Sequence, residues 1–113
     1  MDERQAERVA DAMFALSTPS RVQILACLMG GSRSVSELVE ELGFEQSLVS
    51  HQLRVLREHA LVTVERVGRH RVYGLADEHV TALLEQAVRH VEAGARSRGR
   101  SGKRAASAKL TGA

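Results

Sequence analysis

The chain has 113 residues, of which 43% are hydrophobic and only 3% aromatic, with one Cys and a formal net charge of +2. This length predicts a single domain, and Cys27 alone excludes a disulfide framework or a zinc site built from several cysteines. No apolar run reaches the ~18 residues of a membrane-spanning helix, and the charged start of the chain opens no secretory signal. We therefore expect a soluble, cytoplasmic protein. The low aromatic content argues against binding of single-stranded nucleic acid by stacking.

The positive charge is concentrated at the C-terminal end. Residues 93–113 carry six basic residues and no acidic one, which leaves ten basic and fourteen acidic residues, a net charge of −4, for residues 1–92. The basic segment is rich in Gly, Ser, Ala and Arg and offers almost no side chain for a core. We expect a folded domain over residues 1–95 and a disordered basic tail over residues 96–113, which either is simply solvated or attracts phosphate weakly.

Helical periodicity predicts four helices in the first half of the chain. They run over residues 3–16, from Pro19 to a glycine pair, from Val35 to Leu42, and from Gln46 to His59. Their boundaries carry an N-cap followed by proline, the glycine pair, a capping box and a single glycine, which are Thr18-Pro19, Gly30-Gly31, Ser34 with Glu37, and Gly43.

After the fourth predicted helix, the pattern of apolar residues changes from helical spacing to alternation, which is typical of strands. Residues 61–66 and 70–75 are rich in β-branched side chains, and Val67-Gly68-Arg69 joins them, which predicts a hairpin. Asp77 caps a last amphipathic helix over about residues 78–94. Two short helices joined by a tight Gly-containing turn and followed by a hairpin describe a winged helix-turn-helix. We predict a mainly α fold with a β-hairpin wing, in the order ααααββα.

The second helix of the pair would place its N-terminal half in the major groove of DNA. Gln suits adenine, Ser donates or accepts, and Arg suits guanine or phosphate. The outward residues of that half are Gln46, Ser47, Ser50, His51 and Arg54. The hairpin adds Arg66, Arg69 and Arg71, and residues 46–71 carry five Arg against two Glu, a net charge of +3 where DNA would lie. The alternatives are ordinary solvated side chains, or a winged helix that binds protein rather than DNA.

Five segments resemble the ArsR/SmtB family of bacterial metal-responsive winged-helix repressors: Ala15–Leu25, Ser36–Gly43, Gln46–Arg57, His59–Val62 and Gly68–Leu75. The likeness covers about the first 93 residues. It implies a homodimer, formed through the first and last helices, that binds an inverted-repeat operator in double-stranded DNA and, in most members, releases it when a metal ion binds. The family's cysteine-based type of site is excluded, because residues 32–38 contain no Cys and Cys27 sits among core residues.

The last helix carries the candidate metal ligands. His79 and His90 are 11 residues apart, so they share a face to within about 20° but lie about 16 Å apart along the axis. Because metal ligands lie about 2 Å from the ion, two antiparallel copies of the helix are needed, which predicts two intersubunit sites. The resemblance adds Asp77. Glu92, which points about 140° away from His79, is a secondary candidate, and Ala93 departs from the Glu or His often found in the family.

Imidazole and carboxylate ligands suit Ni(II), Zn(II) or Co(II), and the segment from Asp77 to His90 is most similar to nickel- and cobalt-sensing members, so Ni(II) is favoured. Water or the N-terminal residues Asp2 and Glu3 would complete the set. The alternatives are two interface histidines without a metal and a regulator controlled by a protein co-regulator. No Gly-rich phosphate loop or nucleophile motif is present, so we expect no enzymatic activity.

Overall fold

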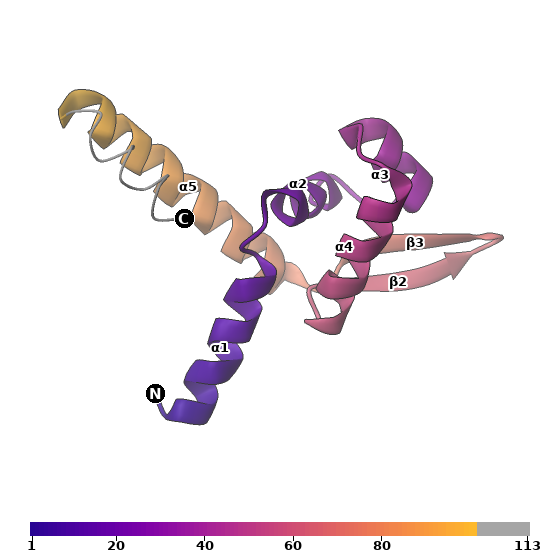
Figure 1. The fold of residues 1–113 in the computed structure, drawn as a ribbon, viewed down its shortest axis with the longest axis horizontal. Helices are drawn as coiled ribbons and strands as arrows, with labels where there is room; N and C mark the ends of the chain where they lie inside the picture. Colours follow the sequence, from indigo (N-terminus) through magenta and orange to yellow (C-terminus); the bar gives the residue numbers. More distant parts are fainter. Residues whose placement is uncertain (102–113) are drawn as a thin grey trace. The chain divides into compact units, whose positions relative to one another are not determined.

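The computed structural model describes the backbone of residues 1–101 and the side chains of residues 1–95 (Figure 1). The elements follow the order α1, α2, β1, α3, α4, β2, β3, α5. Two compact units are distinguished, Met1–Thr81 and a second that begins at Ala82, and the first contains the whole winged helix. The predicted order is confirmed, with β1 as an addition.

The first two helices begin at the predicted signals. Helix α1 (Glu3–Ala15) starts after Asp2, whose carboxylate accepts a hydrogen bond of 2.7 Å from the backbone N–H of Gln5. Helix α2 (Pro19–Leu28) has Thr18 as N-cap residue and proline at its first position, where the missing N–H costs nothing. Most apolar side chains of α1 are exposed in the single chain, including Val9, Met13 and Phe14.

Helices α3 (Val35–Leu42) and α4 (Gln46–Glu58) form the helix-turn-helix. The predicted capping box is present: Glu37 N–H donates to Ser34 Oγ at 3.2 Å, and Ser34 N–H donates to Glu37 Oε1 at 2.8 Å. Gly43 ends α3 in the left-handed conformation, with a φ of 71°, which favours glycine because it lacks a Cβ. The turn between the helices is therefore specified by its sequence at both ends.

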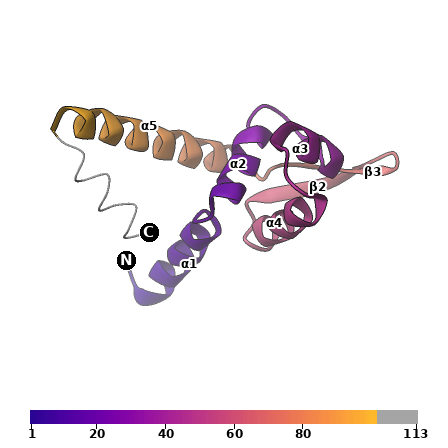
Figure 2. The ribbon, with the colours of Figure 1, turned by 45° about the horizontal axis from the view of Figure 1, so that its top comes forward.

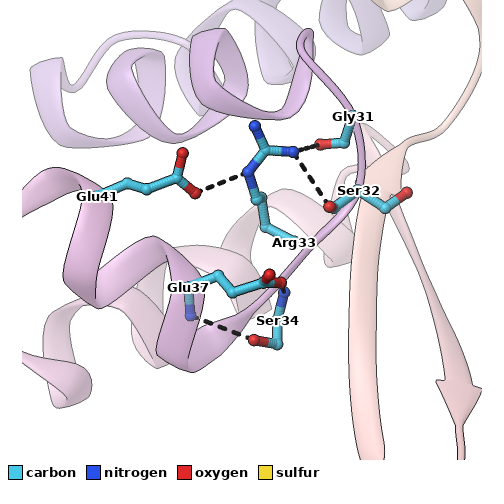
Figure 3. Close-up of polar contacts among 6 residues, drawn as sticks. All are labelled: Gly31, Ser32, Arg33, Ser34, Glu37 and Glu41. Carbon is cyan, nitrogen blue, oxygen red and sulfur yellow. Dashed lines mark hydrogen bonds and ion pairs between the residues drawn. The ribbon is translucent and has the colours of Figure 1, made fainter.

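Arg33 ties the loop before α3 to that helix (Figure 3). Its Nε donates to Glu41 Oε2 at 2.7 Å, and its Nη1 donates to the carbonyl oxygens of Gly31 at 2.7 Å and Ser32 at 3.1 Å. The hydrogen bond to Glu41 raises the pKa of the Arg33 guanidinium, whereas hydrogen bonding to Ser34 lowers the pKa of the Glu37 carboxyl. This network fixes where α3 begins.

The wing is an antiparallel hairpin of β2 (Val62–Val67) and β3 (His70–Leu75). Val67 pairs with His70, so the connection is the two residues Gly68 and Arg69, one fewer than predicted. Gly68 has a φ of 63°, as the tight hairpin turn requires. Strand β1 (Arg33–Ser34) adds to the free edge of β3 and gives the order β1-β3-β2. Two residues carry no periodicity, which is why sequence reasoning missed β1.

The core lies where α2, α3 and α4 meet the base of the wing (Figure 2). The largest fully buried side chains come from these three helices, and they are Ile24, Leu25, Leu38, Val49, Leu53 and Leu56. Leu61 and Val62 extend the core into the first strand of the wing. The buried positions of α4 recur every three to four residues, which turns the opposite side of that helix outward.

Helix α5 (Glu78–Ser101) continues past residue 94, where we expect it to end. Residues 95–101 contain no Pro, which would stop a helix, and Ala95 and the three Arg are good helix formers. The helix therefore passes residue 95, and the division into a domain over 1–95 and a tail over 96–113 stays a prediction; the tail beyond Ser101 lies outside the described residues. Within the described range, no helix combines the length and apolar character that crossing a membrane requires.

Candidate nucleic-acid interface and metal-ligand residues

The outward face of α4 is polar and open. All five residues proposed there to meet DNA are exposed: Gln46, Ser47, Ser50, His51 and Arg54. They recur at helical spacing opposite Val49, Leu53 and Leu56, which are at most 1% exposed. Because a helix offers one face to the core and the other to solvent, the same pattern that anchors α4 presents these side chains as a contiguous stripe.

A buried polar network positions α4 on the body. Arg21 in α2 is 7% exposed and Gln52 in α4 is 6% exposed, and Arg21 Nη1 donates to Gln52 Oε1 at 2.9 Å. Gln52 Nε2 donates in turn to Ser20 Oγ at 2.9 Å. Arg21 also donates to the carbonyl oxygens of Ala15 at 2.5 Å and Phe14 at 3.1 Å. Sequence reasoning missed this network, although a Gln between the buried Val49 and Leu53 of α4 is its signal.

The wing arginines are exposed as well. Arg69 lies in the two-residue turn, and Arg66 lies directly opposite Arg71 in the hairpin register. Side chains of directly opposite residues project from the same face of a sheet. The face that bears these two arginines also carries Val64 and Tyr73, another opposite pair.

A recess of about 240 Å³ lies between α4 and β3. Its lining comes from one stripe of the helix and one face of the strand, and consists of Ser50, Leu53, Arg54, Arg57, Arg71 and Tyr73. The structure thus brings together Ser50, Arg54 and Arg71, which were predicted as separate contacts. It adds Arg57 and Tyr73, which were not in the predicted interface. The spacing of positions 50, 53, 54 and 57 places all four on one helix face and could have identified Arg57.

At the start of α5, Asp77 and His79 lie together. Asp77 Oδ1 accepts hydrogen bonds from the backbone N–H groups of His79 at 2.9 Å and Val80 at 3.3 Å, which confirms Asp77 as the cap. The same oxygen lies 3.5 Å from His79 Nδ1, and the His79 side chain is 93% exposed. An oxygen and a nitrogen donor are therefore adjacent and accessible, a combination that suits a divalent transition metal ion.

The other predicted ligands lie further along α5. His90 and Glu92 are both exposed on α5, and no group of three His, Cys, Asp or Glu side chains gathers in the described part of the chain. Cys27 is half-buried, and burial together with the nearby Glu41 raises the pKa of its thiol, which disfavours the thiolate that a metal would need.

The chain is similar to known regulators over most of its length. Residues 18–64 match the family described as bacterial regulatory protein, arsR family. The HTH-type transcriptional regulator NmtR of Mycobacterium tuberculosis is 50% identical over 92 residues, which cover 81% of this chain and 77% of NmtR. The transcriptional repressor SmtB homolog of Synechocystis is 39% identical over 88 residues, covering 78% of this chain and 67% of that protein.

Solved structures agree with these relatives. The solution structure of apo-NmtR superimposes with a TM-score of 0.70 at 50% identity, covering 81% of this chain and 77% of NmtR. The solution structure of a homodimeric winged helix-turn-helix DNA-binding domain from Mycobacterium bovis superimposes with a TM-score of 0.74 at 28% identity, covering 81% of this chain and 88% of that one. The chain belongs to the ArsR family of bacterial regulatory proteins and is a winged helix-turn-helix transcriptional regulator, not an enzyme.

Proposed function

We propose that the protein acts in the cytoplasm as a homodimeric regulator that binds an inverted-repeat operator and changes its DNA affinity when a divalent metal ion binds between the subunits. The observation that carries the metal part is the pair of Asp77 and His79, with 3.5 Å between Oδ1 and Nδ1 on an exposed helix start. Membership of the ArsR family supports the DNA part.

The DNA contact uses α4 and the wing. The N-terminal half of α4 enters the major groove, where Gln46 suits an adenine edge and Ser47 donates or accepts. His51 and Arg54 extend the same exposed stripe, and the wing contributes Arg66, Arg69 and Arg71 toward the backbone. A dimer repeats this arrangement on two half-sites, which is why an inverted repeat is expected.

The dimer is supported by apolar surface that the single chain leaves open. On α1, Met13 and Phe14 are 57% and 65% exposed, and on α5, Val88 and Val91 are 49% and 61% exposed. Neighbouring exposed apolar side chains on a helix favour burial against a partner. The homodimeric relative from Mycobacterium bovis supports the same assembly for this fold.

The metal ligands come from both subunits. Asp77 and His79 of one chain would meet His90 of the partner subunit across antiparallel copies of α5, twice per dimer, with Glu92 as a secondary ligand. Neutral imidazole and carboxylate are ligands for Ni(II), Zn(II) and Co(II), and Ni(II) is the favoured ion. The N-terminal carboxylates of Asp2 and Glu3 or a water molecule would complete the coordination.

Calorimetric titration of Ni(II) and of Zn(II) into the wild-type protein, His79→Ala and His90→Ala tests the proposal. We expect tight binding at one or two ions per dimer that both substitutions abolish. The same titrations in the presence of operator DNA give the sign of the coupling, because metal and DNA must change each other's affinity by the same factor. Binding that is weak or independent of both histidines would refute metal sensing and leave a DNA-binding regulator controlled by other means.

A further inference from the structure

We propose that the recess between α4 and β3 binds one backbone phosphate of the DNA, with Arg54, Arg57 and Arg71 as its ligands. The inference rests on the proposed DNA binding and divides the interface into two parts. The exposed start of α4, with Gln46 and Ser47, reads bases, and the recess holds a phosphate whatever the sequence. Arg54, which suits either guanine or phosphate, is thereby assigned to phosphate.

Two periodicities build the recess. Ser50, Leu53, Arg54 and Arg57 lie at positions i, i+3, i+4 and i+7 of α4, so they form one stripe along the helix. Arg71 and Tyr73 are two residues apart on β3, so they share one face of the strand. The stripe and the face enclose a space of about 240 Å³, and α4 lies alongside the base of the wing in both ribbon views (Figures 1 and 2).

The side chains in and beside the recess carry an excess of positive charge, which favours binding of an anion. Arg71 faces Arg66 directly across the hairpin, an arrangement of like charges that destabilises a sheet. In the described part of the chain, the ion pairs within 4.0 Å are Arg33 with Glu41 and His79 with Asp77, so no carboxylate neutralises the arginines of the recess. Glu65 pairs with Val72 and thus projects from the opposite face of the hairpin.

The chemistry of the lining selects phosphate. Three guanidinium groups offer only donors, in a planar fork that matches two phosphate oxygens, and the hydroxyls of Ser50 and Tyr73 are further donors. The single apolar member, Leu53, is 1% exposed and forms the floor. A nucleobase edge mixes donors and acceptors, whereas a phosphate diester is an acceptor throughout. The set of groups therefore fits the backbone better than a base.

The test compares two duplexes of equal length, the operator and an unrelated sequence, by fluorescence anisotropy over a range of salt concentrations. Arg57→Gln should weaken binding to both by about tenfold and reduce the slope of log affinity against log salt by about 1. Arg4→Gln, which removes the same charge from α1 outside the recess, is the matched control and should change neither quantity. Arg57→Lys should keep the slope but lose part of the affinity, because it keeps the charge without the fork.

A neutral methylphosphonate linkage, moved one position at a time along the operator backbone, identifies the phosphate itself. At one position per half-site it should weaken wild-type binding more than Arg57→Gln binding, since one of the three arginine contacts is already lost in the variant. A loss in Arg57→Gln confined to the operator, or an equal loss on methylphosphonate substitution in both proteins at every position, would overturn the assignment. If wild-type protein binds neither duplex, the proposed function fails as a whole. Arg71→Gln supplies the same comparison should Arg57→Gln fail to fold.

Discussion

Arg21 Nη1 in α2 donates a hydrogen bond of 2.9 Å to Gln52 Oε1 in α4, across 31 residues of sequence. Both side chains are at least nine-tenths buried, and Arg21 donates from its other nitrogens to the carbonyl oxygens of Phe14 and Ala15 at the end of α1. The guanidinium is thus a single group that binds three helices. No buried side-chain nitrogen or oxygen in the described part of the chain lacks a partner, so the network is complete.

We expect Arg21→Met to lower the free energy of unfolding by about 3 kcal/mol. The substitution keeps an apolar stem but removes the buried donor to Gln52 Oε1 and to the Ala15 carbonyl oxygen, and each such loss costs about 1–3 kcal/mol before relaxation. The Phe14 carbonyl oxygen keeps its hydrogen bonds from Ser17. Urea denaturation at fixed protein concentration measures the effect. Arg69→Met in the exposed hairpin turn should stay within about 0.5 kcal/mol of the wild type. A loss of similar size in both variants would show that the network contributes nothing specific.

The capping box predicts a pH dependence. Hydrogen bonding to Ser34 lowers the pKa of Glu37 below its ordinary value of 4.5, so the folded state favours the carboxylate. Stability from this group is fully present above that ordinary value and is lost as the pH falls through the lowered pKa of the folded state. Glu37→Gln keeps the acceptor but removes the titration, so its unfolding free energy should fall less steeply below pH 5 than that of the wild type.

Chemical denaturation at a series of pH values from 3 to 7 measures this difference. Glu40→Gln, an exposed neighbour on α3 that takes no part in the capping box, serves as the control and should follow the wild-type curve. Parallel curves for the wild type and Glu37→Gln would contradict the prediction.

Gly43→Ala should destabilise the protein by about 1 kcal/mol. A Cβ at this position meets nothing within 4 Å, so the cost comes from the positive φ of 71° alone. Gly30 offers a matched comparison, because its φ is not in the left-handed region and an added Cβ makes ordinary contacts at 3.4 and 3.5 Å. Gly30→Ala should be neutral or slightly stabilising. Thermal unfolding of both variants separates the two cases, and equal shifts would argue against conformational strain at Gly43.

Ala93→His should tighten Ni(II) binding by more than about tenfold. Position 93 lies one turn beyond His90 on the same helix face, so a second imidazole there would complete the ligand set, and direct ligands should exceed the effect of roughly 10–100-fold that outer-shell groups have. Ala95→His places the same side chain about 140° away from His90 and should leave the affinity unchanged. Equal tightening by both substitutions would mean that the added imidazole binds metal elsewhere.

Much of the fold was predictable because local signals agree with one another. The capping box at Ser34 and Glu37, the glycine at 43 and the change of period after residue 60 each specify an element boundary, and the structure confirms them. Strand β1 was not predictable, since two residues show no period and exist as a strand only through pairing with Tyr73 and Val72. The end of α5 was placed too early because composition, which suggests a tail, outweighed helix propensity.

The candidate site also has a part that could be predicted from the sequence and a part that could not. The exposed stripe of α4 follows from helical periodicity, so Gln46 to Arg54 could be named in advance. The recess depends on how β3 lies against α4, which is a tertiary relationship. For that reason the sequence indicated Arg57 only as part of a locally positive segment and did not indicate Tyr73 as a contact. The adjacency of Asp77 and His79 follows from their spacing at a helix start, whereas the proposed contribution of His90 depends on a second subunit.

The clamp formed by Arg21 limits how a signal can reach the DNA. Since one guanidinium holds the last carbonyls of α1, the body of α2 and the middle of α4, these helices cannot slide past one another without exposing a buried charge. In the proposed homodimer, we therefore expect each winged helix to turn as a rigid body. An effector that alters the DNA affinity of that homodimer would do so by changing the angle and spacing between its two winged helices, and the internal geometry of each would remain the same in both states.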